Sequence, residues 1–302
     1  MMILCLRSLC FPVLAGFRFI NLELLIFQVC WLNKVSGLVI NEFLVIFLYV
    51  AIIIGTAGSG KTALTHALSL YLEEKGEDFC ILNLDPGVKD DSLPYTPDIN
   101  VRDFVRVEDV MSYYDLGPNG AFIASMDLVL NHVEDLREQI NDFSPDILLI
   151  DTPGQMEIFA YRPTGSILLN RLLDFPDIRK ALVFIFDPFL CQVSPGTLLS
   201  TLLLAESVYW RFELPMVHVL SKIDLFESEI IDEIINLAKN PSKILVSEET
   251  FAIKHTEKSP LISTLLEKDE ILRKELIPAS SITGDGIFDI YSNLLNAWSE
   301  TG

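Results

Sequence analysis

Residues 55–62 read Gly55-Thr56-Ala57-Gly58-Ser59-Gly60-Lys61-Thr62. They match the pattern G-x-x-x-x-G-K-[ST], in which the glycines let successive backbone N–H groups turn inward around a phosphate. An apolar run, 50–54, precedes these residues, and Lys61–Lys75 has apolar positions at helical spacing. A buried strand, a glycine-rich loop and a helix in this order predict a phosphate-binding loop, with the phosphates at the helix N-terminus.

The polar groups of this loop indicate a nucleoside triphosphate held together with a divalent cation. The Lys61 ammonium can reach the β- and γ-phosphates, and the Thr62 hydroxyl can ligate Mg²⁺. We therefore predict that a nucleotide contacts six residues of the loop: Gly55, Gly58, Ser59, Gly60, Lys61 and Thr62.

Short apolar runs alternate with helical stretches along the rest of the chain. The predicted strands are 50–54, 79–84, 147–150, 181–186, Met216–Leu220 and 277–279, and the clearest predicted helices are Lys61–Lys75 and 127–143. Continuous apolar strands separated by helices indicate a mostly parallel sheet covered by helices on both faces. The predicted fold is therefore an α/β P-loop fold, with a helical insertion at about 225–276, where no strand-like run occurs.

Residues 1–48 differ from the rest of the chain, because they are rich in apolar residues and contain few charges. They lack the basic start and small-residue cleavage site of a signal peptide. Their apolar stretch is interrupted by Arg18, Asn21 and Glu23, which makes it a poor membrane-spanning helix. We predict an apolar N-terminal extension, 1–48, followed by one domain, 49–302. Three interpretations of the extension stay open: translated upstream sequence without a role, a membrane-associating segment, or an additional packed element.

The charge balance is strongly acidic, with 42 Asp and Glu against 22 Lys and Arg and a net charge of −20. Such a surface repels phosphate backbones, so we expect no direct binding of nucleic acid. A single nucleotide is compatible with it, because a local group of backbone N–H donors can hold phosphates. The five cysteines have an odd count and irregular spacing, which fit neither a disulfide framework nor a zinc site. They indicate a reducing compartment, and we predict a cytoplasmic location.

Two aspartates that follow predicted strands form the metal side of the expected site. Asp151 begins the sequence Asp151-Thr152-Pro153-Gly154-Gln155. In such a segment the aspartate holds Mg²⁺ through water, the Gly154 N–H senses the γ-phosphate, and Gln155 orients the attacking water. Asp85 can align water or contact the metal shell, or else serve only as a turn residue. The predicted metal ligands are Thr62, Asp85 and Asp151.

A second sequence, Ser221-Lys222-Ile223-Asp224, follows another predicted strand and resembles the N-K-x-D sequence that reads guanine. Guanine offers two adjacent donors, N1–H and the exocyclic amine, and one carboxylate can accept both. Adenine lacks this pair and would leave the Asp224 carboxylate unpaired. The Lys222 stem can stack on the base, whereas Ser221 replaces the usual Asn. A backbone N–H near the last strand could reach guanine O6 from one of three residues: Ser280, Ser281 and Ile282.

The order of these motifs resembles that of the GPN-loop GTPases, a family of the SIMIBI class. The residues that carry the resemblance are Gly117-Pro118-Asn119, between Asp85 and Asp151, and the flanking sequences Asn83-Leu84-Asp85-Pro86, Leu93-Pro94-Tyr95-Thr96-Pro97, Val101-Arg102-Asp103 and Asp151-Thr152-Pro153-Gly154-Gln155-Met156-Glu157. The resemblance covers about residues 49–302, and the phosphate loop looks most like that of the archaeal branch. Residues 1–48 have no counterpart in the family, and Asn100 stands where the family often has Asp.

The resemblance implies a homodimer that binds GTP with Mg²⁺, hydrolyses it to GDP, and changes shape with the nucleotide as a molecular switch. The loop Gly117-Pro118-Asn119 would reach into the partner's nucleotide site, where Asn119 helps to position the γ-phosphate and water. Further catalytic roles are implied for Asp85, Arg102, Asp103, Gln155 and Glu157. Eukaryotic relatives assist the assembly of RNA polymerase II, which implies protein clients such as RNA polymerase subunits.

Three other functions stay open. An ATPase of the partitioning or metal-chaperone kind often has a second lysine early in its phosphate loop, where this chain has Thr56 and Ala57. A small-molecule or nucleotide kinase would require a basic lid, and the sequence has no arginine-rich segment of that kind. A membrane-tethered scaffold would depend on residues 1–48, and we expect no membrane contact outside them.

Overall fold

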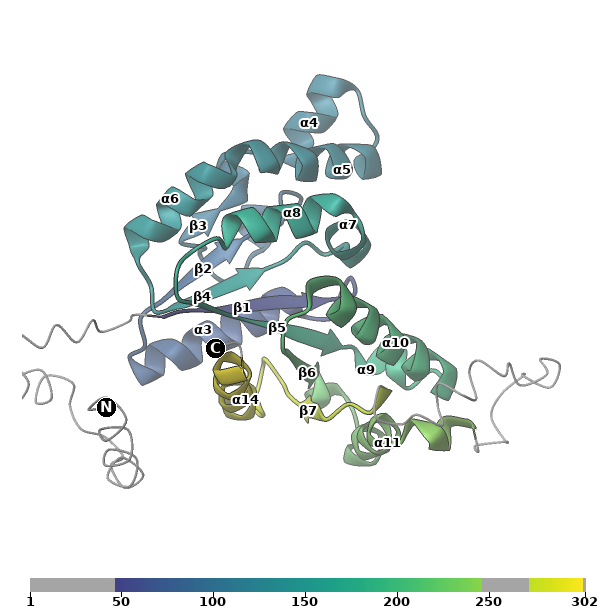
Figure 1. Cartoon of the computed structure of the whole chain (residues 1–302). Coiled ribbons are helices and arrows are strands. Elements are labelled where there is room, and N and C mark those ends of the chain that lie inside the picture. The colour runs from purple at the N-terminus through teal and green to yellow at the C-terminus, as the bar shows by residue number, and fades with distance from the viewer. Residues whose placement is uncertain (1–46, 246–271, 301–302) are drawn as a thin grey trace, which may run out of the picture. The chain divides into compact units, whose positions relative to one another are not determined.

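The computed structural model describes residues 47–245 and 272–300, which belong to one compact unit. Its centre is a seven-stranded sheet in the order β3-β2-β4-β1-β5-β6-β7, and neighbouring strands in this order pair in parallel (Figure 1). The strands are β1 (Leu48–Gly55), β2 (Phe79–Asn83), β3 (Ile99–Asn100), β4 (Ile147–Asp151), β5 (Ile178–Phe186), β6 (Met216–Leu220) and β7 (Leu276–Pro278). This arrangement confirms the predicted α/β fold with its parallel sheet.

The central strand β1 shows why both faces of the sheet are covered. Its alternate residues Val50, Ile52 and Ile54 pack into one apolar layer, and Ala51 and Ile53 pack into the other. All five are completely buried. A strand buried on both faces has no polar positions to alternate with apolar ones, so its sequence is a continuous apolar run.

Two helices cover one face of the sheet, namely α3 (Lys61–Lys75) and α14 (Ile287–Glu300) (Figure 1). The opposite layer is formed by α4 (Val107–Tyr114), α5 (Pro118–Val129), α6 (Val133–Phe143), α7 (Met156–Tyr161), α8 (Pro163–Leu172), α9 (Pro188–Cys191), α10 (Pro195–Phe212) and α11 (Ser228–Lys239). Among the described helices, none combines the length and the apolar character that crossing a bilayer requires.

Helix α3 begins and ends where the sequence analysis places it, and a glycine in the left-handed region lies at each end. Gly60 has φ 100° before the first residue, and Gly76 has φ 71° after the last. The Gly76 N–H donates to carbonyl oxygens of the last turn. A left-handed residue ends a helix in this way, and glycine adopts that conformation without a steric penalty.

The predicted helix 127–143 is wrong in its extent. The chain instead forms α5, a 3-10 turn (Leu130–His132) and α6. Pro118 starts α5 nine residues before the predicted beginning, because proline has a helical φ and its missing N–H costs nothing at the first helical position. Helix α4 and the two-residue strand β3 were not predicted, since each is too short for hydrophobic periodicity to be clear.

Up to residue 245 the predicted insertion is mainly helical, with α11 and a 3-10 turn, Pro241–Leu245. At its other end, residues 273–275 have no regular secondary structure and β7 begins at Leu276. Residues 246–271 of the insertion lie outside the described residues, and so do residues 1–46 of the predicted N-terminal extension. The boundary predicted at residue 49 lies one residue after the start of β1. The division into an extension and a domain with an insertion therefore stays a prediction.

Candidate nucleotide-binding site

The polar residues predicted to bind nucleotide follow the carboxyl ends of five strands. Because parallel strands end at the same edge of a sheet, their following loops lie together there. Gly55 ends β1, Asp151 ends β4, and Asp85 lies two residues after β2. Ser221 follows β6 directly, and Ser280 lies two residues after β7.

The phosphate loop wraps around its own lysine. The Lys61 side chain is buried, and its Nζ donates to the carbonyl oxygens of Gly55 at 2.9 Å and Thr56 at 3.0 Å. A third carbonyl, that of Gly154, lies 3.4 Å away on the loop after β4. Burial lowers the pKa of Lys61, while the carboxylate of Asp151 acts most strongly in the opposite direction. The ammonium therefore lies between the two halves of the site.

A cavity of about 430 Å³ opens in front of this loop. Its lining consists of Gly58, Gly60, Lys61, Thr62, Ala63, Asp85, Ser92, Pro94, Thr152 and Gly154. Cavities of a few hundred Å³ are typical of small-ligand sites. A larger cavity, about 830 Å³, lies at the amino ends of β5, β6 and β7, and none of the site residues predicted from the sequence lines it.

Asp151 has the features of a cation ligand. It is 2% exposed, and its Oδ2 accepts a hydrogen bond from the Tyr95 hydroxyl at 2.7 Å. Its Oδ1 is buried and makes no hydrogen bond within the described residues. Burial raises the pKa of Asp151 to about 6, and the Tyr95 and Thr62 hydroxyls partly offset this shift. An unsatisfied carboxylate oxygen beside a hydroxyl is the oxygen donor set that Mg²⁺ prefers, so these residues fit the predicted ion.

Asp85 joins the turn after β2 to the loop after β4. Its Oδ1 accepts from the Gly87 N–H at 2.8 Å, and its Oδ2 accepts from the Gly154 N–H at 3.1 Å. The Gly154 N–H, which the sequence analysis assigns to the γ-phosphate, donates to this carboxylate here. Gln155 and Glu157 have exposed side chains at the start of α7, next to the same loop.

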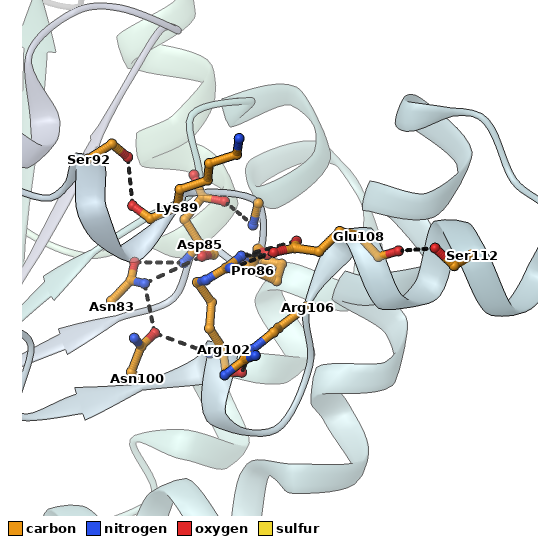
Figure 2. A network of polar contacts seen from close by, with 11 residues as sticks. Asn83, Asp85, Pro86, Lys89, Ser92, Asn100, Arg102, Arg106, Glu108 and Ser112 are labelled. Carbon is orange, nitrogen blue, oxygen red and sulfur yellow. Dashed lines mark hydrogen bonds and ion pairs between the residues drawn. The ribbon is translucent and has the colours of Figure 1, made fainter.

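Asp85 belongs to a network of polar side chains that is drawn in Figure 2. Asn83 Nδ2 donates to Asn100 Oδ1 at 2.9 Å, and the same oxygen accepts from the Arg102 N–H at 3.1 Å. Position 100 therefore acts as an acceptor, a role that the Asn100 side-chain oxygen fills as an aspartate oxygen would. The buried Arg102 guanidinium contacts Glu108 and the Pro86 carbonyl, and it does not line the phosphate cavity. The side chain of Asp103 is exposed.

Ser221 links the base-reading side to the phosphate loop. Its Oγ lies 2.8 Å from the Ser59 carbonyl oxygen and 3.2 Å from that of Phe186. Lys222 has φ 54°, and its Nζ donates to the Gly58 carbonyl at 2.6 Å and to Asp187 Oδ2 at 2.9 Å. Ser221 and Lys222, which follow β6, therefore both hold the phosphate loop in place.

Asp224 lies exposed beside the segment that follows β7. Its Oδ1 accepts from the Ser280 hydroxyl at 2.5 Å. The Ser280 oxygen in turn accepts from the N–H groups of Ile282 at 3.2 Å and Thr283 at 3.1 Å. Ser280 is buried, Ser281 is half-buried and Ile282 is exposed. The hydroxyl of Ser280 therefore orients the carboxylate that is predicted to read guanine.

The predicted residues Gly117, Pro118 and Asn119 lie apart from this group. Gly117 caps α5, Pro118 is its first residue, and all three are exposed. None of them lines the phosphate cavity of this chain. The exposed side chains of Tyr113 and Tyr114 lie just before them, at the end of α4.

Four residues of the site were not assigned a role from the sequence: Tyr95, Glu108, Thr152 and Asp187. The Thr152 hydroxyl donates to the Ile53 carbonyl at 2.7 Å and so ties the two halves of the site together. Asp187 is the first residue after β5, just as Asp151 is the last residue of β4 and Asp85 lies two residues after β2. An aspartate at the end of a predicted strand was therefore a signal that could have identified Asp187.

Comparison with known proteins adds three observations. The family described as "conserved hypothetical ATP binding protein" matches residues 53–299. The chain is 37% identical to the GPN-loop GTPase QQT1 of Arabidopsis thaliana over 59% of each protein. It is 32% identical to GPN-loop GTPase 1 of Dictyostelium discoideum over 80% of this chain and 60% of the relative. The chain thus spans about three fifths of the length of these curated relatives.

A solved structure agrees with the fold over most of the chain. It is that of a GTPase from Pyrococcus abyssi in its apo form, with 27% sequence identity and a TM-score of 0.69. The match covers 83% of this chain and 97% of the archaeal one.

Proposed function

This chain belongs to the GPN-loop GTPase family, and we propose that it binds GTP with Mg²⁺ and hydrolyses it to GDP and phosphate. One observation carries the proposal. The phosphate loop, the buried Asp151 with its unsatisfied oxygen, and the exposed Asp224 carboxylate lie at the same edge of the sheet. These groups match the three chemical parts of a guanine nucleotide complex, which are the phosphates, the cation and the base.

The phosphate loop holds the triphosphate in this proposal. Its backbone N–H groups and the N-terminus of α3 attract the negative charge, and Lys61 neutralises the β- and γ-phosphates. Thr62 and Asp151 would hold Mg²⁺, with Asp85 in the metal shell, and the ion would stabilise the negative charge that develops on the phosphate oxygens. The net charge of −20 makes this local positive group necessary, since the rest of the molecule repels phosphate.

Hydrolysis requires a water in line with the γ-phosphorus. Its oxygen forms a bond to that phosphorus while the bond to the β–γ bridging oxygen breaks, which leaves GDP, and the proton passes to the released phosphate and solvent. Gln155 and Asp85 lie on the two segments that flank the cavity and would orient the water. Glu157 and Asp103 are assigned to the surrounding water network by resemblance to the family.

Asn119 is exposed and lies outside the phosphate cavity of its own chain. We assign it, with Gly117 and Pro118, to the nucleotide site of a second copy. The exposed aromatic residues Tyr113 and Tyr114 beside it support a contact of this kind. The protein would then be a homodimeric switch. Resemblance to the family suggests that it assists the assembly of a larger complex such as RNA polymerase.

We place the protein in the cytoplasm, where cysteines stay reduced. The described cysteines, Cys80 and Cys191, are free and buried. Burial raises the pKa of each thiol to about 12, so both are inert apolar side chains rather than reactive groups.

Calorimetry with GTP and with ATP, both in the presence of Mg²⁺, tests the proposal, because the matching family is described as ATP-binding. We expect heat from GTP and at least about tenfold weaker binding of ATP, since adenine leaves Asp224 without its two donors. Asp224→Asn should remove most of this preference. Lys61→Ala is the control for loss of all nucleotide binding. Tighter binding of ATP than of GTP would identify an ATPase instead.

A further inference from the structure

The segment Asp85-Pro86-Gly87 lies where the phosphate site meets helices α4 and α5. Asp85 accepts the Gly154 N–H on the side of the cavity. The Pro86 carbonyl accepts from the Val107 N–H at 3.2 Å, and Val107 is the first residue of α4. One tripeptide thus contacts both the loop after β4, which lines the phosphate cavity, and the beginning of the helix that precedes the Gly-Pro-Asn loop.

Arg102 and Glu108 add further contacts at the point where Asp85-Pro86-Gly87 meets the start of α4. The Arg102 side chain is 5% exposed and donates to the Pro86 carbonyl at 2.8 Å. It also donates to both carboxylate oxygens of Glu108, at 2.6 Å and 3.3 Å. Glu108 belongs to the first turn of α4, and the hydrogen bonds from Arg102 lower its pKa. Because a two-point contact between a guanidinium and a carboxylate has a defined geometry, it fixes the direction in which α4 leaves the sheet.

Arg102 is itself held from the sheet side. Its N–H donates to Asn100, which accepts from Asn83 at the end of β2 (Figure 2). The chain of contacts therefore runs from the strand ends through Arg102 to α4. Helix α4 packs against α5, whose first residues are Pro118 and Asn119.

A second contact reaches α5 directly. A β-carbon placed on Gly87 would lie 3.0 Å from Phe122 Cε2 in the second turn of α5. This distance is shorter than most Cβ contacts, so a side chain at position 87 would push against the Phe122 ring and require it to shift by a few tenths of an ångström.

We propose that Arg102 and Glu108 are positioning residues, whose ion pair holds helices α4 and α5 so that Asn119 reaches the hydrolytic centre in which it acts. The proposal rests on the role assigned above to Asn119. It gives Arg102 a function at a distance from the phosphates. The Asp85–Gly87 segment then joins the loop that contacts the γ-phosphate to the helices that carry the Gly-Pro-Asn loop.

A double-mutant cycle on the full chain tests the proposal, with single-turnover GTP hydrolysis and GTP affinity as the measurements. Glu108→Ala should slow hydrolysis about tenfold or more, because small displacements of a positioned group cost that much, and should leave GTP affinity within about twofold. Glu108→Gln, whose carbonyl oxygen can still accept from Arg102, should recover part of the rate. Glu108→Ala in an Asn119→Ala background should cause no further loss, because the group that it positions is already absent.

Asp109→Asn is the matched control, since Asp109 is exposed on the same turn of α4. It should hydrolyse GTP at the parent rate. Gly87→Ala gives an independent measurement and should slow hydrolysis in the same way, while Phe122→Leu should restore the rate in that variant. Thermal unfolding of each variant checks that the fold is retained.

The outcomes separate the two proposals. If Asn119→Ala hydrolyses GTP at the parent rate, the assigned role of Asn119 is wrong, and the positioning role fails with it. If Asn119→Ala is slow but Glu108→Ala is not, only the positioning role is overturned. The positioning role is also overturned if the rate losses of Glu108→Ala and Asn119→Ala multiply in the double variant, because Glu108 then acts independently of Asn119.

Discussion

Asp187 is one residue on which the arrangement of the base-reading side depends. It is 7% exposed, caps the short helix α9 through the Phe189 N–H, and pairs with Lys222 at 2.9 Å. The Lys222 stem is the group expected to lie along the base, and its ammonium is held between Asp187 and the Gly58 carbonyl. Asp187 therefore determines where this stem lies before a nucleotide arrives.

We expect Asp187→Asn to weaken GTP binding about fivefold, equivalent to roughly 1 kcal/mol for a partly exposed ion pair. The substitution keeps the size of the side chain and its acceptor for the Phe189 N–H, but it removes the charge that holds Lys222. Titration calorimetry with GTP measures the effect. The matched control is Asp289→Asn, an exposed position in the first turn of α14, which should bind GTP as the parent does. Unchanged affinity in Asp187→Asn would show that the Gly58 carbonyl alone holds Lys222.

At the scale of elements, α14 connects the end of the described chain to the central strand. Its Trp298 is 1% exposed, and the indole Nε1–H donates to the Val50 carbonyl at 2.9 Å. The ring also packs against Tyr49, with 5.1 Å between ring centroids. Helix α14 therefore stabilises the strand from which the phosphate loop begins.

Trp298→Ala should lower the free energy of unfolding by about 3–5 kcal/mol, because it leaves a large cavity in the layer between α14 and β1. Trp298→Phe keeps most of the apolar volume and should cost less, with about 1 kcal/mol from the lost hydrogen bond. Urea unfolding followed by circular dichroism gives both values. Equal loss in the two variants would mean that the hydrogen bond, rather than the packing, holds the helix.

For the whole molecule, the proposed dimer places the two halves of one site on different subunits. The phosphate cavity is lined by residues of the sheet edge, whereas Asn119 lies exposed at the start of α5. A subunit that binds nucleotide and a subunit that supplies Asn119 can therefore be different copies of the chain.

Mixing two inactive variants tests this arrangement. Lys61→Ala subunits cannot bind nucleotide but retain Asn119, and Asn119→Ala subunits bind nucleotide but lack the loop residue. We expect the mixture to hydrolyse GTP several times faster than the sum of the separate variants, because each mixed dimer contains one complete site. Light scattering should give twice the chain mass of 34.0 kDa. A mixture no faster than that sum would contradict action in trans.

Much of the molecule could be predicted because its signals are local. The run before Gly55, the glycine pattern of the loop and the apolar spacing of Lys61–Lys75 each lie within a few residues, and the structure places β1 and α3 accordingly. The predicted extent of the helix at 127–143 was wrong because the signal for its boundaries is not local. The boundary between α5 and α6 depends on how both helices pack on the sheet, which periodicity in a short window does not contain.

The sequence by itself determined the fold class, the phosphate loop and most of the polar residues that follow the strands, although not Asp187, because each of these signals depends on neighbours along the chain. Tertiary structure decided which of these residues contact each other. Arg102 was assigned a catalytic role by resemblance to the family, and its pairing with Glu108 was not visible in the sequence. Ser221 was a departure from the N-K-x-D pattern in the sequence, and the structure places its hydroxyl against the Ser59 carbonyl. Such contacts join residues from separate elements, and their geometry exists only after the sheet has brought the strand ends together.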